Sequence, residues 1–123
     1  MLKVDFFSNE IKVKNKRVII RLDLNVPIKN ATIIDDTRLK VAKPLIEDLI
    51  RKEAIIILIS HLGRPKGNKV KDLSLKPVYE YYKKNLKTKV HFYEKNIDAQ
   101  AINFSKKLNS GEILMLENIR FFK

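Results

Sequence analysis

The chain of 123 residues contains no cysteine, only three glycines and only four prolines. Without cysteine it can form neither disulfide bonds nor thiolate metal sites, which fits a reducing compartment. The scarcity of glycine and proline, with 45% hydrophobic and 33% charged residues, is typical of a globular chain and not of a disordered one. This length predicts one domain, or part of one.

Long apolar runs are missing too. No run approaches the ~20 residues of a membrane span, and the start, MLKVDFFSNEIKVKNKR, holds no apolar segment long enough for a signal peptide. We therefore expect a cytoplasmic protein without a membrane partner.

Several chemical motifs are also absent. The chain has no GxxxxGK[ST] or GxGxxG phosphate loop, no HExxH, no acidic calcium loop and no pattern of an activated serine or cysteine nucleophile. Of its two histidines, His91 falls within a strand pattern and is expected to be structural. We expect no cofactor-binding residue and no metal ligand in this chain.

Acidic residues are few relative to basic ones. Fourteen Asp and Glu stand against 26 Lys and Arg, which gives a net charge of +12 and a pI near 9.9. Such a field attracts phosphates, whether on nucleic acid, on a membrane or on a small metabolite. The lysines are scattered from Lys3 to Lys123 without a dense block, as on a solvated surface. A basic nucleic-acid-binding module without sequence preference remains an alternative function.

Apolar patterning predicts strands that alternate with helices. The run 54–59 has no alternation and favours a strand covered on both faces of a parallel sheet. The expected strands are 17–24, 54–59, 89–93 and 111–116, and the expected helices are 39–50, 75–87 and 98–108. This order predicts an α/β fold, a Rossmann-like three-layer arrangement of a parallel sheet with helices on both faces.

Local signals refine the helices. Pro44 is expected to kink or divide the first helix, and Ser74 to cap the second, whose tyrosines Tyr79 and Tyr82 keep phase with its apolar face. Arg38 falls in the first turn of the first helix, where the helix dipole opposes a cation. A functional role for Arg38 and a surface pair with Asp35 or Asp36 are both consistent with this position.

Polar residues follow three of the expected strands. Asp23 and Asn25 follow the first, His61 and Arg64 the second, and Arg120 the last. Because sequential parallel strands share a direction, these residues should meet at one rim, where open α/β sheets bind ligands. Asp23 and Asn25 cannot favour an anion by charge, but they can hydrogen-bond to a hydroxyl.

The arginines predict an anion site. Arg38, Arg64 and Arg120 each offer a planar fork for phosphate or carboxylate. His61 adds a donor whose charge varies near neutral pH, and Gly63 allows the backbone to approach a ligand closely. The ligand implied is small, with one or two anionic groups and a hydroxyl.

In these stretches the chain resembles the N-terminal part of the phosphoglycerate kinase family. The resemblance lies in RLDLNVP (21–27), DDTR (35–38), SHLGRPKG (60–67), SLKPV (74–78) and GEILMLENIRF (111–121). The first, third and fifth blocks are specific to that family. The chain departs from the family at Leu24, where phenylalanine is usual, and at Glu53, where glycine is usual.

The resemblance implies reversible phosphoryl transfer between 1,3-bisphosphoglycerate and Mg-ADP, which yields 3-phosphoglycerate and Mg-ATP. The family is usually monomeric and divides this task between two α/β domains, the N-terminal one for the glycerate ligand and the C-terminal one for the nucleotide and Mg²⁺. Residues 1–123 are thus expected to be an incomplete N-terminal domain, without the nucleotide domain and inactive alone. A functionless truncated relic is a further alternative.

The resemblance also implies roles for individual residues. Arg38 corresponds to the catalytic arginine that stabilises charge on the transferring phosphoryl group. Asp23 and Asn25 correspond to contacts near the ligand's hydroxyl and carboxyl end. The positions that correspond to phosphate contacts are His61, Leu62, Gly63, Arg64 and Arg120.

Overall fold

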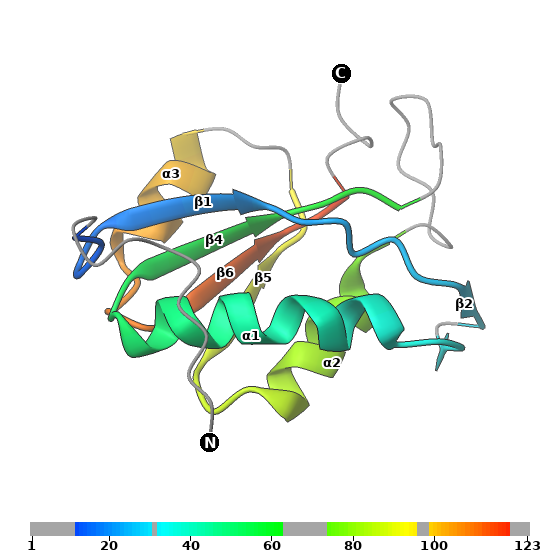
Figure 1. Cartoon of the computed structure of the whole chain (residues 1–123). Helices are drawn as coiled ribbons and strands as arrows, with labels where there is room; N and C mark the ends of the chain where they lie inside the picture. Colours follow the sequence, from blue (N-terminus) through cyan, green and yellow to red (C-terminus); the bar gives the residue numbers. More distant parts are fainter. Residues whose placement is uncertain (1–11, 31, 63–73, 96–98, 119–123) are drawn as a thin grey trace.

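The computed structural model describes residues 12–30, 32–62, 74–95 and 99–118. Its main sheet has four parallel strands in the order β1-β4-β6-β5 (Figure 1). These strands are β1 (Arg17–Arg21), β4 (Ile55–Ile59), β6 (Ile113–Leu116) and β5 (Val90–Tyr93).

Helices cover both faces of this sheet. The helices are α1 (Thr37–Arg51), α2 (Lys76–Asn85) and α3 (Ala99–Lys106). Helices α1 and α2 lie on one face and α3 lies on the other (Figure 1). The predicted three-layer α/β fold is confirmed. Within the part of the chain that the structure describes, no helix is long and apolar enough to cross a membrane.

The core has two parts because the sheet is buried on both sides. Ile56 and Leu58 of β4 pack with α1 and α2, whereas Ile57 belongs to the cluster on the α3 side. Full burial of one such side chain contributes roughly 1.5–3 kcal/mol. The unbroken apolar run of β4 is explained by this double cover.

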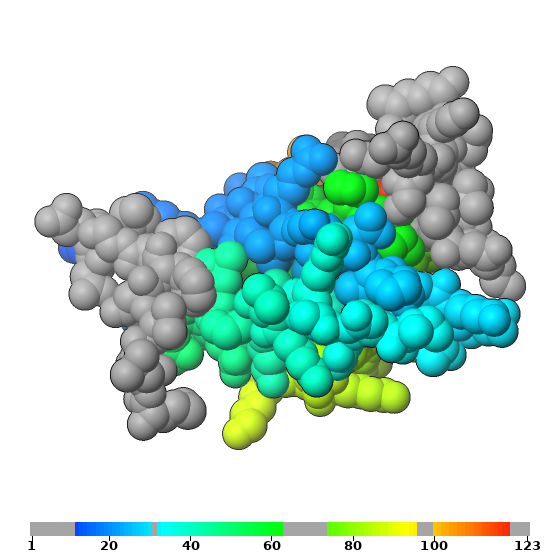
Figure 2. Space-filling view, turned by 45° about the vertical axis from the view of Figure 1, so that its right-hand side comes forward, coloured from blue at the N-terminus to red at the C-terminus, as the bar shows by residue number. Residues whose placement is uncertain are grey.

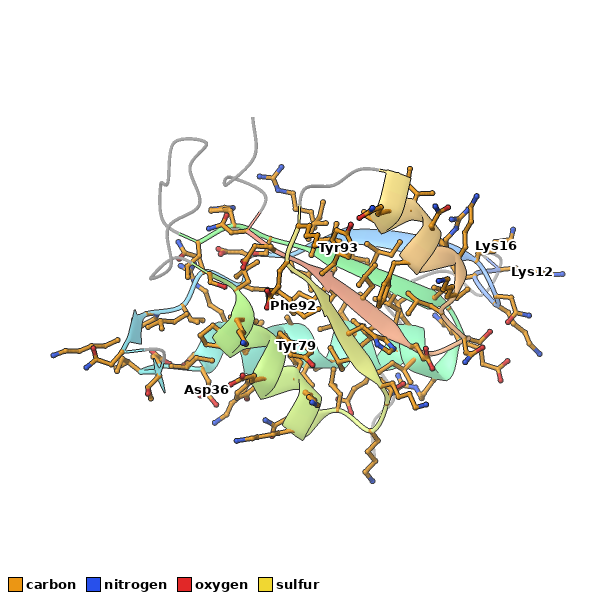
Figure 3. All side chains as sticks on the ribbon, turned by 180° about the vertical axis from the view of Figure 1, so that it is seen from behind. Lys12, Lys16, Asp36, Tyr79, Phe92 and Tyr93 are labelled. Atoms are coloured by element: carbon orange, nitrogen blue, oxygen red, sulfur yellow. The ribbon has the colours of Figure 1, made fainter. Side chains whose placement is uncertain are left out.

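The tyrosines of α2 belong to the core, as expected. Tyr82 is fully buried, and Tyr79 stacks on Phe92 of β5 with ring centroids 5.2 Å apart (Figure 3). An aromatic pair of this kind contributes about 0.5–1.5 kcal/mol beyond the area that it buries. Helix α2 is thereby fixed against the sheet.

Proline does not divide the first helix. Helix α1 continues through Pro44, so the proline does not divide it, and the kink allowed by the sequence stays a prediction. A proline inside a helix costs about 3 kcal/mol, but Leu39 lies before it and Ile46 and Leu49 after it, all fully buried. Because both halves of the helix are anchored in the core, packing outweighs the local penalty.

A left-handed residue ends this helix. Glu53 has φ 58°, and its N–H donates to the carbonyl of Ile50, while the N–H of Ala54 donates to the carbonyl of Leu49. Helices commonly end in this way, with glycine at the left-handed position. Glu53 therefore places a side chain where the backbone favours glycine.

The sequence patterns missed a small hairpin. Strands β2 (Ile28–Lys29) and β3 (Thr32–Ile33) pair antiparallel beside the start of α1. Two-residue strands are too short to show an alternation, so the pattern gave no signal. Strand β1 also ends at Arg21, earlier than the expected Leu24.

Candidate functional site

The carboxyl ends of β1, β4 and β6 lie side by side at one rim of the sheet (Figure 1). The rim carries Asp23 and Asn25 after β1, His61 and Leu62 after β4, and the first turn of α1. Figure 2 shows the segment between β1 and α1, in blue to cyan, next to the end of β4, in green, on one face of the molecule.

Arg38 binds to the end of β1. Its Nη1 lies 2.9 Å from both carboxylate oxygens of Asp23 and 3.1 Å from the carbonyl oxygen of Asn25. The N–H of Asn25 donates to Oδ1 of Asp23 at 3.2 Å. The structure thus brings three of the predicted site residues into direct contact.

Arg38 does not pair with the aspartates of its own helix start. Oδ1 of Asp35 accepts the N–H and the hydroxyl of Thr37 at 3.0 and 2.6 Å, and these hydrogen bonds lower the pKa of Asp35. Asp36 binds Lys40 and Tyr81. The surface pairing considered as an alternative is therefore wrong.

The Arg38 ion pair is exposed. The side chain of Arg38 is 55% exposed and that of Asp23 62% exposed. An exposed pair contributes no more than about 1 kcal/mol to stability. All three contacts use Nη1, so the rest of the guanidinium makes no hydrogen bond to the described residues. As far as the described residues go, this geometry leaves the outer edge of Arg38 available to an anion.

Helix α2 holds the first turn of α1. The hydroxyl of Tyr82 donates to the carbonyl of Leu39 at 2.9 Å, and that of Tyr81 donates to Oδ2 of Asp36 at 3.0 Å. Figure 3 shows Asp36 beside α2. Burial raises the pKa of Tyr82 above its ordinary range and also raises that of Tyr81, to which the hydrogen bond to Asp36 adds. Both hydroxyls therefore remain donors near neutral pH, and Arg38 projects from a fixed helix start.

His61 and Leu62 lie at the end of β4, next to the strand that carries Asp23. His61 is half-buried and Leu62 is buried. The Leu62 carbonyl accepts a hydrogen bond from the side-chain amide of Asn118 at 2.7 Å. The backbone at this strand end therefore has a defined position. Three of the predicted site residues, Gly63, Arg64 and Arg120, lie outside the described residues and stay predictions.

Three polar side chains under the rim are buried, and the sequence patterns assigned them no role of their own: Ser60, Glu117 and Asn118. Ser60 Oγ accepts the N–H of Leu24 at 3.1 Å, which links the exits of β4 and β1. Ser60 and Glu117 each immediately follow an apolar strand, and Asn118 comes one residue later; this position is the signal that could have found them.

His91 is structural, as expected. It lies in β5, with Nε2 3.3 Å from Oε1 of Glu112 and the ring edge-on to Phe104. Burial tends to raise the pKa of Glu112, but hydrogen bonds from Asn109 and His91 outweigh it and lower the pKa.

Comparisons with known proteins agree with this geometry. The family model described as phosphoglycerate kinase matches residues 8–123. The phosphoglycerate kinase of Buchnera aphidicola subsp. Schizaphis graminum is 50% identical over an alignment of 116 residues, which covers 91% of this chain and 28% of that protein. That of Leptospira biflexa is 46% identical over 114 residues, which are 93% of this chain and 29% of that protein.

Solved structures show the same relation. The crystal structure of phosphoglycerate kinase from Pyrococcus horikoshii OT3 superimposes with a TM-score of 0.81 at 33% identity, over 91% of this chain and 27% of that chain. The enzyme from Coxiella burnetii gives 0.79 at 35% identity, over 97% and 29%. The chain thus spans less than a third of the length of these relatives. With its sequence blocks, its sheet topology and its rim in agreement, the chain belongs to the phosphoglycerate kinase family.

Proposed function

We propose that this chain supplies the glycerate-binding part of a cytoplasmic, monomeric phosphoglycerate kinase. The glycolytic reaction would transfer a phosphoryl group between 1,3-bisphosphoglycerate and ADP, giving 3-phosphoglycerate and ATP. The observation that carries the proposal is the contact of Arg38 with Asp23 and Asn25 at the carboxyl rim of a parallel sheet. Open α/β sheets bind ligands at such a rim.

Arg38 has the central role in this proposal. Asp23 holds the guanidinium through Nη1, so its remaining donors can meet the acyl phosphate of 1,3-bisphosphoglycerate or the carboxylate that takes its place in 3-phosphoglycerate. A fixed positive charge beside the transferring phosphoryl group stabilises the charge that develops there, and positioning and electrostatics of this kind carry most of the catalysis in phosphoryl transfer. Asp23 orients Arg38 and, with Asn25, hydrogen-bonds to the ligand's hydroxyl.

The phosphate of the ligand would bind at the end of β4. His61 and the backbone at Leu62 lie there, and Gly63, Arg64 and Arg120 are assigned to the same phosphate from their sequence positions. An arginine fork binds phosphate in bidentate fashion, and a glycine allows close backbone approach.

The family implies a magnesium nucleotide, and the described residues do not fit one. Within residues 12–30, 32–62, 74–95 and 99–118, no group of three or more His, Asp or Glu side chains could hold a metal ion. Both oxygens of Asp23 face Arg38. We therefore assign the nucleotide and Mg²⁺ to a C-terminal domain that these 123 residues do not include, and we place this chain in the N-terminal domain.

The test is an NMR titration of the chain with 3-phosphoglycerate, with inorganic phosphate as the control ligand. We expect saturable shifts at Asp23, Arg38 and His61 that inorganic phosphate does not reproduce. Arg38→Ala should weaken binding at least tenfold, a change of about 1.4 kcal/mol, and should lower the free energy of unfolding by no more than about 1 kcal/mol.

Arg51→Ala is the matched control, because Arg51 is an arginine at the other end of the same helix, where it pairs with Asp48. This variant should bind 3-phosphoglycerate like the wild type. A wild-type chain that ignores the ligand, or Arg38→Ala binding with unchanged affinity, would contradict the proposal. Salt-sensitive binding to single-stranded DNA that does not depend on Arg38 would favour the nucleic-acid alternative.

A further inference from the structure

Glu117 is a buried carboxylate at the end of β6, with 2% of its surface exposed. Its Oε2 accepts the hydroxyl of Ser74 at 2.6 Å, and its Oε1 accepts the N–H of Leu75 at 2.8 Å and that of Asn118 at 2.7 Å. A buried carboxylate is costly unless such donors compensate it. The start of α2 is thereby tied to the end of a strand that follows 42 residues later in the chain.

Asn118 makes a second tie from the same strand end. Its side chain is fully buried, and its Nδ2 donates to the carbonyl of Leu62 at 2.7 Å. Leu62 follows β4 and Ser74 precedes α2, so the adjacent residues Glu117 and Asn118 hold both ends of the connection between β4 and α2. Hydrogen bonds in such a buried network are costly to break singly.

The hydrogen bonds of Glu117 and Asn118 fix the ligand-binding rim at two places. Asn118 fixes the backbone at Leu62, next to His61. Glu117 fixes the start of α2, and farther along that helix Tyr82 holds the carbonyl of Leu39, the residue after Arg38. Loss of the Asn118 hydrogen bond should therefore shift the backbone beside His61, and loss of the Glu117 hydrogen bonds should shift the helix start that carries Arg38. Neither Glu117 nor Asn118 is among the predicted ligand contacts.

We propose that Glu117 and Asn118 are positioning residues for the glycerate ligand. The inference rests on the proposed function of the rim. Removal of one oriented hydrogen bond beneath a binding group should weaken affinity for 3-phosphoglycerate by about tenfold. The loss should exceed what a general loss of stability causes.

The experiment compares Asn118→Asp and Glu117→Gln with the wild type in the 3-phosphoglycerate titration, at a temperature well below every unfolding midpoint. Aspartate has the shape of asparagine but cannot donate to the Leu62 carbonyl. Glutamine retains one acceptor oxygen, so Glu117→Gln should lose less affinity than Asn118→Asp and should fold. If Asn118→Asp does not fold, Asn118→Ser, which keeps a shorter donor, replaces it and should also weaken binding.

Ser105→Ala is the matched control. Ser105 is a buried polar residue of α3, on the opposite face of the sheet, where its hydroxyl donates to the carbonyl of Ile102 at 2.7 Å. This variant should lose stability and keep its affinity. The inference would be overturned if Asn118→Asp and Glu117→Gln bind 3-phosphoglycerate like the wild type, or if Ser105→Ala binds it as weakly as those two variants. Either result would leave the proposed function intact. A wild-type chain that does not bind 3-phosphoglycerate would overturn the proposed function itself.

Discussion

Tyr82 allows a sharp test of how α2 holds the first turn of α1. The side chain is fully buried, and its hydroxyl donates to the carbonyl of Leu39 at 2.9 Å. Tyr82→Phe removes this hydroxyl and leaves the ring in place. At neutral pH we expect the free energy of unfolding to fall by about 1 kcal/mol, the net contribution of one hydrogen bond.

The same hydroxyl makes stability depend on alkaline pH. Burial raises the pKa of Tyr82 well above the unfolded value of about 10, and the charge of Tyr81 adds to this. Because the raised pKa favours the neutral form in the folded state, the stabilisation is fully present below pH 10 and is lost as pH rises further. Above pH 10 the wild type should lose up to about 1.4 kcal/mol per pH unit through this group.

Tyr82→Phe has no such loss. Its deficit of about 1 kcal/mol at pH 7 should therefore shrink above pH 10, and the two stability curves should cross at about pH 10.6. The assay is urea unfolding at a series of pH values from 7 to 11. Circular dichroism is the suitable signal, because the chain has no tryptophan.

Tyr81→Phe is the comparison variant. The pKa of Tyr81 is raised by burial first and then by its hydrogen bond to Asp36, but its side chain is only partly buried. As pH rises above 10, the difference in free energy of unfolding between Tyr81→Phe and the wild type should shrink less than the difference between Tyr82→Phe and the wild type. A gap between the wild type and Tyr82→Phe that stays constant from pH 7 to 11 would refute the reasoning, because Tyr82 would then ionise equally in both states.

Two further predictions concern left-handed backbone and have opposite signs. Gly111→Ala should lower the free energy of unfolding by about 1–2 kcal/mol, because φ is +81° there, while the added Cβ would meet the Ile50 carbonyl oxygen only at an ordinary 3.8 Å. Urea unfolding of the variant checks this, and unchanged stability would show that no backbone strain arises. Glu53→Gly should raise the free energy of unfolding by up to about 1 kcal/mol, because glycine suits the φ of 58° and the lost pair with Lys14 is exposed. Glu53→Ala is its control, since it loses the same pair without gaining glycine's freedom; equal stability of the two variants would contradict the argument.

Helices and strands with a clear apolar period were predictable from the sequence. The run at 54–59 and the helical spacing from Leu39 to Ile50 correspond to β4 and α1, because burial of one face imposes a local period on the chain. The family blocks and the meeting of strand ends at one rim were also predictable, since parallel strands share a direction. The hairpin of β2 and β3 was not, because two residues carry no period.

Where a local sequence preference competes with long-range packing or pairing, only the tertiary structure decided the outcome. A local rule divides α1 at Pro44, but core packing on both sides of the proline keeps the helix whole. Local charge favoured Asp35 or Asp36 as the partner of Arg38, whereas the actual partner, Asp23, lies 15 residues away at the end of β1.

The buried ties beneath the rim are more distant still. Glu117 binds Ser74 across 43 positions and Asn118 binds Leu62 across 56. Periodicity is a property of neighbouring residues, so the chain by itself determined its elements and the edge at which their polar ends gather. Contacts over such separations exist only after the strands have paired in register, and for that reason the partners of Arg38, Glu117 and Asn118 were decided by the fold.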